Sequence, residues 1–254
     1  MLPAATSDVA ALSITGVFGI VESAEPYHQL ARQIWGVKET VVIDDGLAGY
    51  YGALGGRNGV ALTLGGGVVA VAGRAATFAH TDGLGSIFGD EGSGYWLGSR
   101  GIVRALATQD QRDNERDLEL FMRDELAAFD RLAVKNSSEA ASLAISSAKK
   151  VLDAADAEIP SAVAIREEGA MRLAHTVIGA WKKAGGALHE KPTIAISGGL
   201  SRSQSYVNLI MEKVRHEIAD AELIAPVGNN LDGAQFIAEN IGHDQPPLMK
   251  WARE

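Results

Sequence analysis

Cysteine is absent from the 254-residue sequence. The chain therefore cannot form disulfide bonds, use a catalytic thiol, or ligate zinc or an iron–sulfur cluster through cysteine. Basic residues are also few relative to acidic ones, with 23 Lys and Arg against 32 Asp and Glu and a formal net charge of −9. This balance argues against broad electrostatic binding to nucleic acid, but it still allows backbone amides and a metal ion to hold an anionic nucleotide locally.

Long apolar runs are missing as well. No run of about 18 apolar residues occurs, so we expect no transmembrane helix. The start of the chain lacks the basic region of a signal peptide, so we expect a cytoplasmic protein. What remains is a globular composition, 46% hydrophobic and 22% charged, at a length that suits one large domain or two small ones.

The order of apolar segments and turns in the first part of the chain predicts an α/β fold. We expect a strand at 9–20, a helix at 25–36, a strand ending in acids at 39–45 and a short helix at 46–54. Because this order is β-α-β-α, the two strands are expected to pair in parallel. Residues 59–80 then predict a meander of two or three strands with a glycine triplet in the first turn.

The later part of the chain is mostly helical. Helical spacing of apolar residues appears at 114–133 and 161–188. A strand, glycine turn and helix follow at 192–214, then a last strand at 221–228, a helix from about Leu231 and an irregular tail at 242–254.

Four strands end in glycine or acid. These ends lie at Asp44–Asp45, at the glycines 65–67, at the "SGG" of 197–199 and at the "PVG" of 226–228. In open α/β sheets, ligands bind at the carboxyl ends of strands, and glycines there allow the backbone to approach a phosphate closely. The repeated pattern therefore indicates a ligand site, although each glycine by itself is more often only a turn residue.

The stretch "GDEGSGYWLG" at 89–98 places two adjacent acids in a glycine frame. Asp90 and Glu91 could bind a ligand, because carboxylates accept paired hydrogen bonds from hydroxyl groups. They could also be no more than favourable charges at the positive end of a helix that starts near Glu91.

These segments together resemble the N-acetylglucosamine kinase and BadF/BadG/BcrA/BcrD-type ATPase family of the sugar kinase, heat-shock ATPase and actin superfamily. The most specific match is "GDEGSGYWLG". The other matching segments are "VVIDDGLAG" (41–49), "LTLGGGVVAVA" (62–72), "GLG" (83–85), "IAISGGLSRS" (194–203) and "PVGNNLDGAQFIAE" (226–239). The resemblance runs from about residue 10 to 240.

The resemblance implies an α/β, ribonuclease-H-like (actin-like ATPase) fold with two lobes, the first of them incomplete. Residues 1–57 are expected to form the remnant of the N-terminal lobe, and 58–228 a C-terminal lobe with a helical insertion. Residues 229–254 are expected to pack back on the N-terminal lobe as a helix and tail. A homodimer is also implied, whereas no nucleic-acid or membrane partner is expected.

The resemblance assigns the general base to Asp45, which would take the proton of a sugar hydroxyl as that oxygen attacks the γ-phosphoryl group of ATP. The ordinary interpretation is that Asp45 caps the helix at 46–54. For Asp44 we expect a role in substrate binding or capping. Asp90, Glu91 and Gly85 are expected at the sugar.

The nucleotide is assigned to two glycine turns. Gly65, Gly66 and Gly67 would donate amides to phosphates, and Gly198 and Gly199 would lie against adenosine. The family's usual Gly-Thr-Gly-Ser is replaced by three glycines and Val68, so two hydroxyls are missing. We expect His80 to be a polar filler and Trp96 a core residue.

The largest departure from the family concerns its opening Asp-Gly-Gly-Gly-Thr loop, which holds phosphates and positions Mg²⁺. That motif does not occur in this sequence, so the resemblance implies a shortened N-terminal lobe.

The functional expectation is an ATP- and Mg²⁺-dependent amino-sugar kinase that makes N-acetylglucosamine 6-phosphate, with no residue assigned to direct metal binding. The alternative is a catalytically silent relic that binds sugar or nucleotide. Family activators of acyl-CoA dehydratases that bridge their subunits with an iron–sulfur cluster need cysteine ligands, which this chain lacks.

Overall fold

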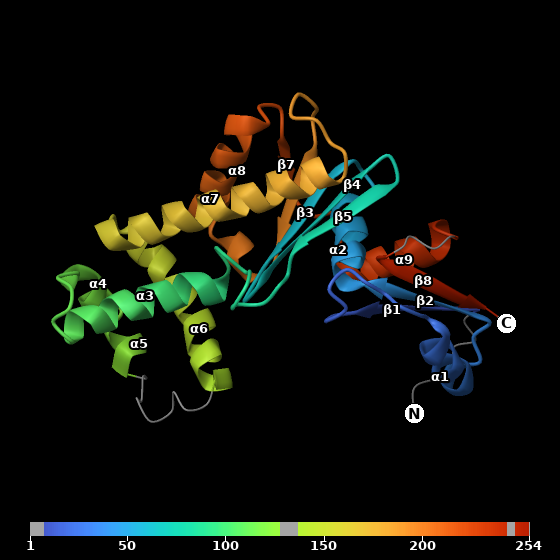
Figure 1. Cartoon of the computed structure of the whole chain (residues 1–254), viewed down its shortest axis with the longest axis horizontal. Helices are drawn as coiled ribbons and strands as arrows, with labels where there is room; N and C mark the ends of the chain where they lie inside the picture. Colours follow the sequence, from blue (N-terminus) through green and yellow to red (C-terminus); the bar gives the residue numbers. More distant parts are fainter. Residues whose placement is uncertain (1–7, 128–136, 243–246, 254) are drawn as a thin grey trace.

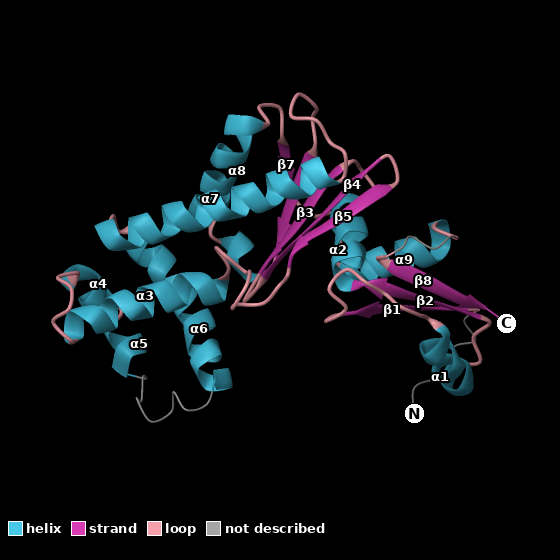
Figure 2. Ribbon diagram, viewed as in Figure 1, coloured by secondary structure: helices cyan, strands magenta, loops and turns pink. Residues whose placement is uncertain are grey.

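The computed structural model describes residues 8–127, 137–242 and 247–253. It contains two β-sheets with helices between and around them (Figures 1 and 2). Parts of three expected segments lie outside the described residues: 1–7 of the N-terminal remnant, 128–133 of an expected helix, and 243–246 and 254 of the tail. None of the helices in the described ranges is long and apolar enough to cross a membrane.

The strands are β1 (Val9–Ile14), β2 (Glu39–Asp44), β3 (Gly59–Leu64), β4 (Val68–Arg74), β5 (Thr77–Asp82), β6 (Thr193–Ser197), β7 (Glu222–Ile224) and β8 (Met249–Arg253). The helices are α1 (Glu25–Trp35), α2 (Asp45–Leu54), α3 (Gly94–Gln109), α4 (Arg116–Phe121), α5 (Arg123–Ala127), α6 (Ser137–Asp156), α7 (Pro160–Lys183), α8 (Gln204–Glu217) and α9 (Asn230–Asn240), with a 3₁₀ turn η2 (Gly199–Arg202).

The smaller sheet has the strand order β1-β2-β8. Strands β1 and β2 run parallel, as expected, with Ile14 opposite Asp44 at their carboxyl ends. The irregular tail that we expected is wrong, because Met249–Arg253 forms β8 and pairs antiparallel with β2. This five-residue strand includes two basic residues and is too short to carry a periodic signal, so only its pairing partner defines it.

The larger sheet has the order β5-β4-β3-β6-β7. The expected meander is confirmed: β3, β4 and β5 are antiparallel neighbours, and β6 and β7 continue the sheet in parallel from β3. Alternate residues of β3 face opposite sides, since Leu62 belongs to the core under the long helices and Ala61 to the core next to α2. The long helix expected at 114–133 is interrupted, because α4 ends at Phe121 and α5 begins at Arg123.

Helix α2 lies between the two sheets, while α3 to α6 gather at the far end of the larger sheet (Figure 1). Helix α9 packs closely on α2 through glycine. A Cβ placed on Gly52 or on Gly233 would collide with the backbone of the opposite helix, at Asn229 and Ala48 respectively. Residues 229–240 therefore lie against the helix that follows β2, and α2 joins the cores of both sheets.

Candidate functional site

A cavity of about 510 Å³ opens where the ends of the two sheets face each other. Its wall is made by the turn after β1, the start of α2, the turn between β3 and β4, the end of β5 and Asp90. Of the residues that the sequence assigned to a site, the cavity is lined by Asp44, Asp45, Gly65, Gly66, Gly67 and Asp90. These residues come from three separate segments of the chain, which the fold brings to one place.

Asp44 is buried and acts as the N-cap of α2. Its Oδ1 accepts hydrogen bonds from the N–H groups of Gly46 at 3.0 Å and Leu47 at 3.3 Å. Its Oδ2 accepts the N–H of Gly19 at 3.0 Å, so the same carboxylate also fixes the turn after β1. The capping role that we considered for Asp45 therefore belongs to Asp44.

Asp45 is the first residue of α2 and stands at the wall of the cavity. Burial raises the pKa of its carboxyl above the usual value, and the negative charge of Asp44 raises it further. The hydroxyl of Thr15, the amide of Gly46 and the ring of His80 favour the ionised form and oppose this rise. The result is a half-buried carboxylate with increased basicity, as a general base requires.

The glycine turn at 65–67 connects β3 to β4 and is supported from behind by α3. The N–H groups of Gly94 and Tyr95 donate to the carbonyls of Gly65 and Gly66, at 2.8 and 3.0 Å. Within the turn, the N–H of Gly65 donates to the carbonyl of Gly67 at 2.9 Å. The first turn of α3 thus uses its amides to hold the glycine turn and does not present them to the cavity.

Asp90 touches the same turn from the other side. Its Oδ1 accepts the N–H of Val68 at 3.0 Å. Burial raises the pKa of the Asp90 carboxyl, the Val68 hydrogen bond lowers it, and the charge of Asp82 raises it again. The backbone at Asp90 is left-handed, with φ 58°.

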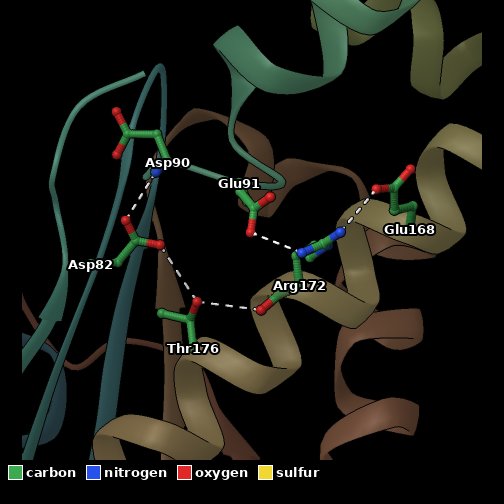
Figure 3. A network of polar contacts seen from close by, with 6 residues as sticks. All are labelled: Asp82, Asp90, Glu91, Glu168, Arg172 and Thr176. Atoms are coloured by element: carbon green, nitrogen blue, oxygen red, sulfur yellow. Dashed lines mark hydrogen bonds and ion pairs between the residues drawn. The ribbon is translucent and has the colours of Figure 1, made fainter. Parts of the chain in front are cut away.

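The helix that we expected to start near Glu91 begins at Gly94, with Ser93 as its N-cap. The left-handed conformations of Asp90 and Gly92 prevent an earlier start. Asp90 and Glu91 therefore do not belong to the first helical turn. Glu91 turns away from the cavity and forms an ion pair with Arg172 of α7 at 3.3 Å (Figure 3). Glu91 and Gly85 do not line the cavity.

The "SGG" turn lies at a second cavity, of about 560 Å³, between α6 and the start of α8. Gly199 lines this cavity together with Lys149, Asp153 and Arg202. Gly198 lies beneath it with φ 96°, and a Cβ there would collide with the backbone of Leu64. Since Leu64 ends the strand that leads into the glycine turn, the two cavities share one structural support.

Several cavity residues were not assigned to the site from the sequence. His80 lines the cavity, and its ring lies against Gly19 and Gly83, where added Cβ atoms would come within 3.0 and 3.3 Å of it. Thr15 and Phe18 follow β1. The only sequence signal for these residues is their position just after or near the end of a strand, which is too common to single them out.

The two mixed sheets and the cavity at their ends define a two-lobed α/β protein with the ribonuclease-H-like fold of actin-like ATPases. The chain belongs to the BadF/BadG/BcrA/BcrD ATPase family, whose model matches residues 4–235. The family and the two-lobed α/β fold that we predicted are thereby confirmed. A comparison with curated proteins gives no match.

Solved structures that share the fold include the following three. A candidate N-acetylglucosamine kinase from Chromobacterium violaceum is 24% identical, with 93% of this chain and 78% of that one covered at a TM-score of 0.70. A second such candidate, from Porphyromonas gingivalis, is 17% identical, with coverage of 84% and 71% and a TM-score of 0.62. A candidate N-acetylmannosamine kinase from Listeria monocytogenes is 10% identical, with coverage of 92% and 79% and a TM-score of 0.54.

Proposed function

We propose that the chain is an ATP-dependent amino-sugar kinase that phosphorylates the 6-hydroxyl of N-acetylglucosamine. The observation that carries the proposal is the half-buried Asp45, whose raised pKa and position in the cavity with the glycine turn suit a general base near a phosphate. Membership of an ATPase family supports the use of ATP. The names of the structural neighbours support an amino sugar as the acceptor.

In this mechanism the carboxylate of Asp45 accepts the proton of the sugar hydroxyl while that oxygen attacks the γ-phosphorus. The new bond joins the sugar oxygen to phosphorus. The bond between the γ-phosphorus and the bridging oxygen breaks, and its electron pair leaves on ADP. A positioned base of this kind contributes about 10²–10⁴-fold to the rate. Asp44 would act indirectly, by fixing the start of α2 and hence the position of Asp45.

The glycine turn would bind phosphate through its backbone. In the described part of the chain, the N–H groups of Gly65 and Val68 donate to Gly67 and Asp90, and the amides of Gly66 and Gly67 remain for a ligand. A side chain larger than hydrogen would narrow the approach to these amides. Asp90 lies beside this turn, within reach of the same cavity, and would accept hydrogen bonds from sugar hydroxyls.

Magnesium would enter with ATP. The described residues include no group of three or more His, Cys, Asp or Glu side chains that could hold a metal by themselves. Mg²⁺ in kinases usually keeps several waters and is bound largely through substrate phosphates, so it would be carried into the cavity by ATP, and Asp45 would stay free to act as the base. The ion would supply neutralisation of phosphate charge.

Adenosine would occupy the second cavity. Gly199 leaves its wall open, because nothing lies within 4 Å of where its Cβ would be. The same wall carries both signs of charge, since Asp153 and Asp156 line it with Lys149 and Arg202, and Lys149 pairs with Asp153 at 2.6 Å. Since Gly198 packs on Leu64, at the end of the strand that leads into the glycine turn, the same backbone supports the walls of both cavities.

A second candidate function is a catalytically silent protein that binds sugar or nucleotide. It is favoured by the composition of the glycine turn at 65–67, where three glycines and Val68 provide no hydroxyl. Phosphoryl transfer depends on neutralising and positioning the phosphates, so a weak cradle would reduce the rate strongly.

The deciding experiment measures ADP release by the chain with ATP, Mg²⁺ and N-acetylglucosamine, glucosamine, N-acetylmuramic acid or glucose. Turnover with N-acetylglucosamine that is lost in Asp45→Asn would support the kinase, and phosphorus NMR of the product would identify the phosphorylated hydroxyl. Folded protein that binds N-acetylglucosamine by calorimetry but turns over none of the sugars would favour the silent binding protein.

A further inference from the structure

Asp82, the last residue of β5, ties together both ends of the loop that leads to Asp90 (Figure 3). Its Oδ1 accepts the N–H of Gly83 at 2.9 Å and also the N–H of Asp90 at 2.9 Å. Asp82 and Asp90 both have left-handed backbones, with φ 64° and 58°. One carboxylate oxygen therefore closes the loop at a point where the chain twice adopts a conformation that most residues avoid.

Two glycines leave room for these carboxylates, because a side chain at either position would collide with one of them. A Cβ on Gly89 would lie 2.5 Å from Oδ1 of Asp82, and a Cβ on Gly67 would lie 2.8 Å from Oδ2 of Asp90. The side chain of Asp90 then reaches the amide of Val68. The contacts thus run from Asp82 to the backbone of Asp90, and from the Asp90 carboxylate to the glycine turn.

Helix α7 fixes this arrangement from outside the cavity (Figure 3). The hydroxyl of Thr176 lies 3.5 Å from Oδ2 of Asp82 and also donates to the carbonyl of Arg172 at 3.3 Å. One helical turn away, the guanidinium of Arg172 pairs with Glu91. The loop is therefore attached to α7 on either side of Asp90.

We propose that Asp82 is a positioning residue for the substrate: it holds Asp90 in the orientation that binds the sugar and keeps Asp90 against the phosphate turn. The identity of the bound sugar rests on the function proposed above. Asp82 itself does not line the cavity, so it acts through Asp90 and contacts neither the sugar nor the phosphates.

Two substitutions distinguish hydrogen-bond acceptance by the Asp82 side chain from a need for its negative charge. Asp82→Gly removes the carboxylate and tolerates the left-handed backbone, so it adds no conformational strain. Asp82→Asn keeps an oxygen that can accept the same two N–H groups, and asparagine also tolerates that conformation. Asp113→Gly is the matched control, since the exposed Asp113 carboxylate accepts the N–H of the next residue in the same way, at 2.8 Å.

In the kinase assay we expect Asp82→Gly to raise the KM for the sugar about tenfold with little change in kcat, because ground-state and transition-state binding through Asp90 weaken together. For Asp82→Asn and Asp113→Gly, the KM for the sugar and kcat should stay close to those of the unmodified enzyme. The double variant Asp82→Gly/Asp90→Gly should have the same KM for the sugar as Asp90→Gly alone, because both changes remove the same interaction between Asp90 and the sugar. Additive increases in KM would overturn the proposal.

A second measurement does not depend on activity. Hydrogen exchange at the Val68 amide, followed by NMR, should be faster in Asp82→Gly and Asp90→Gly and unchanged in Asp82→Asn. Gly89→Ala should also speed exchange at the Val68 amide, because its Cβ would push the Asp82 carboxylate away from Asp90. This variant replaces Asp82→Gly in the measurement if Asp82→Gly does not fold. Unchanged Val68 exchange in the variants that fold would contradict positioning by Asp82. Failure of every sugar in the assay would instead contradict the proposed function and leave the exchange result to decide on Asp82.

Discussion

Asp44 and Asp45 are adjacent in the chain, yet their carboxylates have separate surroundings. Asp44 accepts three backbone N–H groups and is 1% exposed, whereas Asp45 stands half-buried at the cavity wall. The first carboxylate joins the turn after β1 to the start of α2, and its negative charge raises the pKa of the second. A pair of acids at the end of a strand thus divides into one structural group and one group available for chemistry.

Substitutions at these two positions should have opposite effects on the stability of the fold. Asp45→Asn is expected to lower turnover by about 10²–10⁴-fold. It should also raise the melting temperature at neutral pH, because it removes a charge that burial disfavours. Asp44→Ala should lower the free energy of unfolding by at least about 1 kcal/mol, through loss of the N-cap. Thermal melting and ADP release on both variants check this, and a destabilised Asp45→Asn would contradict the division described above.

The pH dependence of the rate should reflect the raised pKa of Asp45. A base works only when ionised, so kcat/KM should fall as the pH drops through a value above 3.8, the usual pKa of aspartate. A pH–rate profile with the preferred sugar measures this midpoint. A rate that is flat down to pH values near the usual pKa would exclude Asp45 as the base.

The same carboxyls affect stability in a defined direction. Asp45 and Asp90 both have pKa values raised by burial, so the folded state binds their protons more tightly than the unfolded state. Their contribution therefore favours folding at low pH and is lost as the pH rises through the folded-state pKa. The gain in melting temperature of Asp45→Asn/Asp90→Asn over the unmodified chain should be larger at pH 7 than near pH 4. An equal gain at both pH values would show that these carboxyls do not titrate as described.

Two residues of the glycine turn at 65–67 provide a matched pair. A Cβ on Gly67 would press on Oδ2 of Asp90, whereas nothing lies within 4 Å of a Cβ on Gly65. We expect Gly67→Ala to displace Asp90 and raise the KM for the sugar by about tenfold, with a smaller effect of Gly65→Ala on that constant. Equal sugar KM values in the two variants would indicate that Asp90 does not bind the sugar.

The second cavity can be tested by filling it. Gly199→Val places a branched side chain in open space at the cavity wall, so folding should be little affected. We expect the KM for ATP to rise while the KM for the sugar stays the same. Steady-state kinetics with each substrate varied in turn measures both constants. A rise confined to the KM for the sugar would indicate that adenosine does not bind in this cavity.

The sequence predicts the local parts of this structure well. Strand β2, helix α2 and the β3–β5 meander follow from apolar patterning and glycine positions, and Trp96 is buried as expected. The division between Asp44 and Asp45 does not follow from the sequence, because it depends on which residue has the extended backbone of an N-cap. Both residues are aspartates, and aspartate is a good cap at either position.

Long-range contacts are what the sequence does not reveal. Glu91, which the resemblance assigns to the sugar, pairs with Arg172 of a helix 81 residues further along the chain. No local pattern links these two residues. The role of Asp82 is hidden for the same reason, since its carboxylate meets Asp90 only after the loop has closed.

Strand β8 ties the position of Asp44 to a segment far along the chain. The carbonyl of Leu248 accepts the N–H of Asp44, and Met249 pairs with Ile43, so β2 receives its second neighbour from a strand that follows the whole larger sheet in the sequence. Pairing across so long a separation costs more loop-closure entropy than forming the local β3–β5 meander. In refolding, the cavity wall at Asp44 is therefore expected to form later than the glycine turn that faces it.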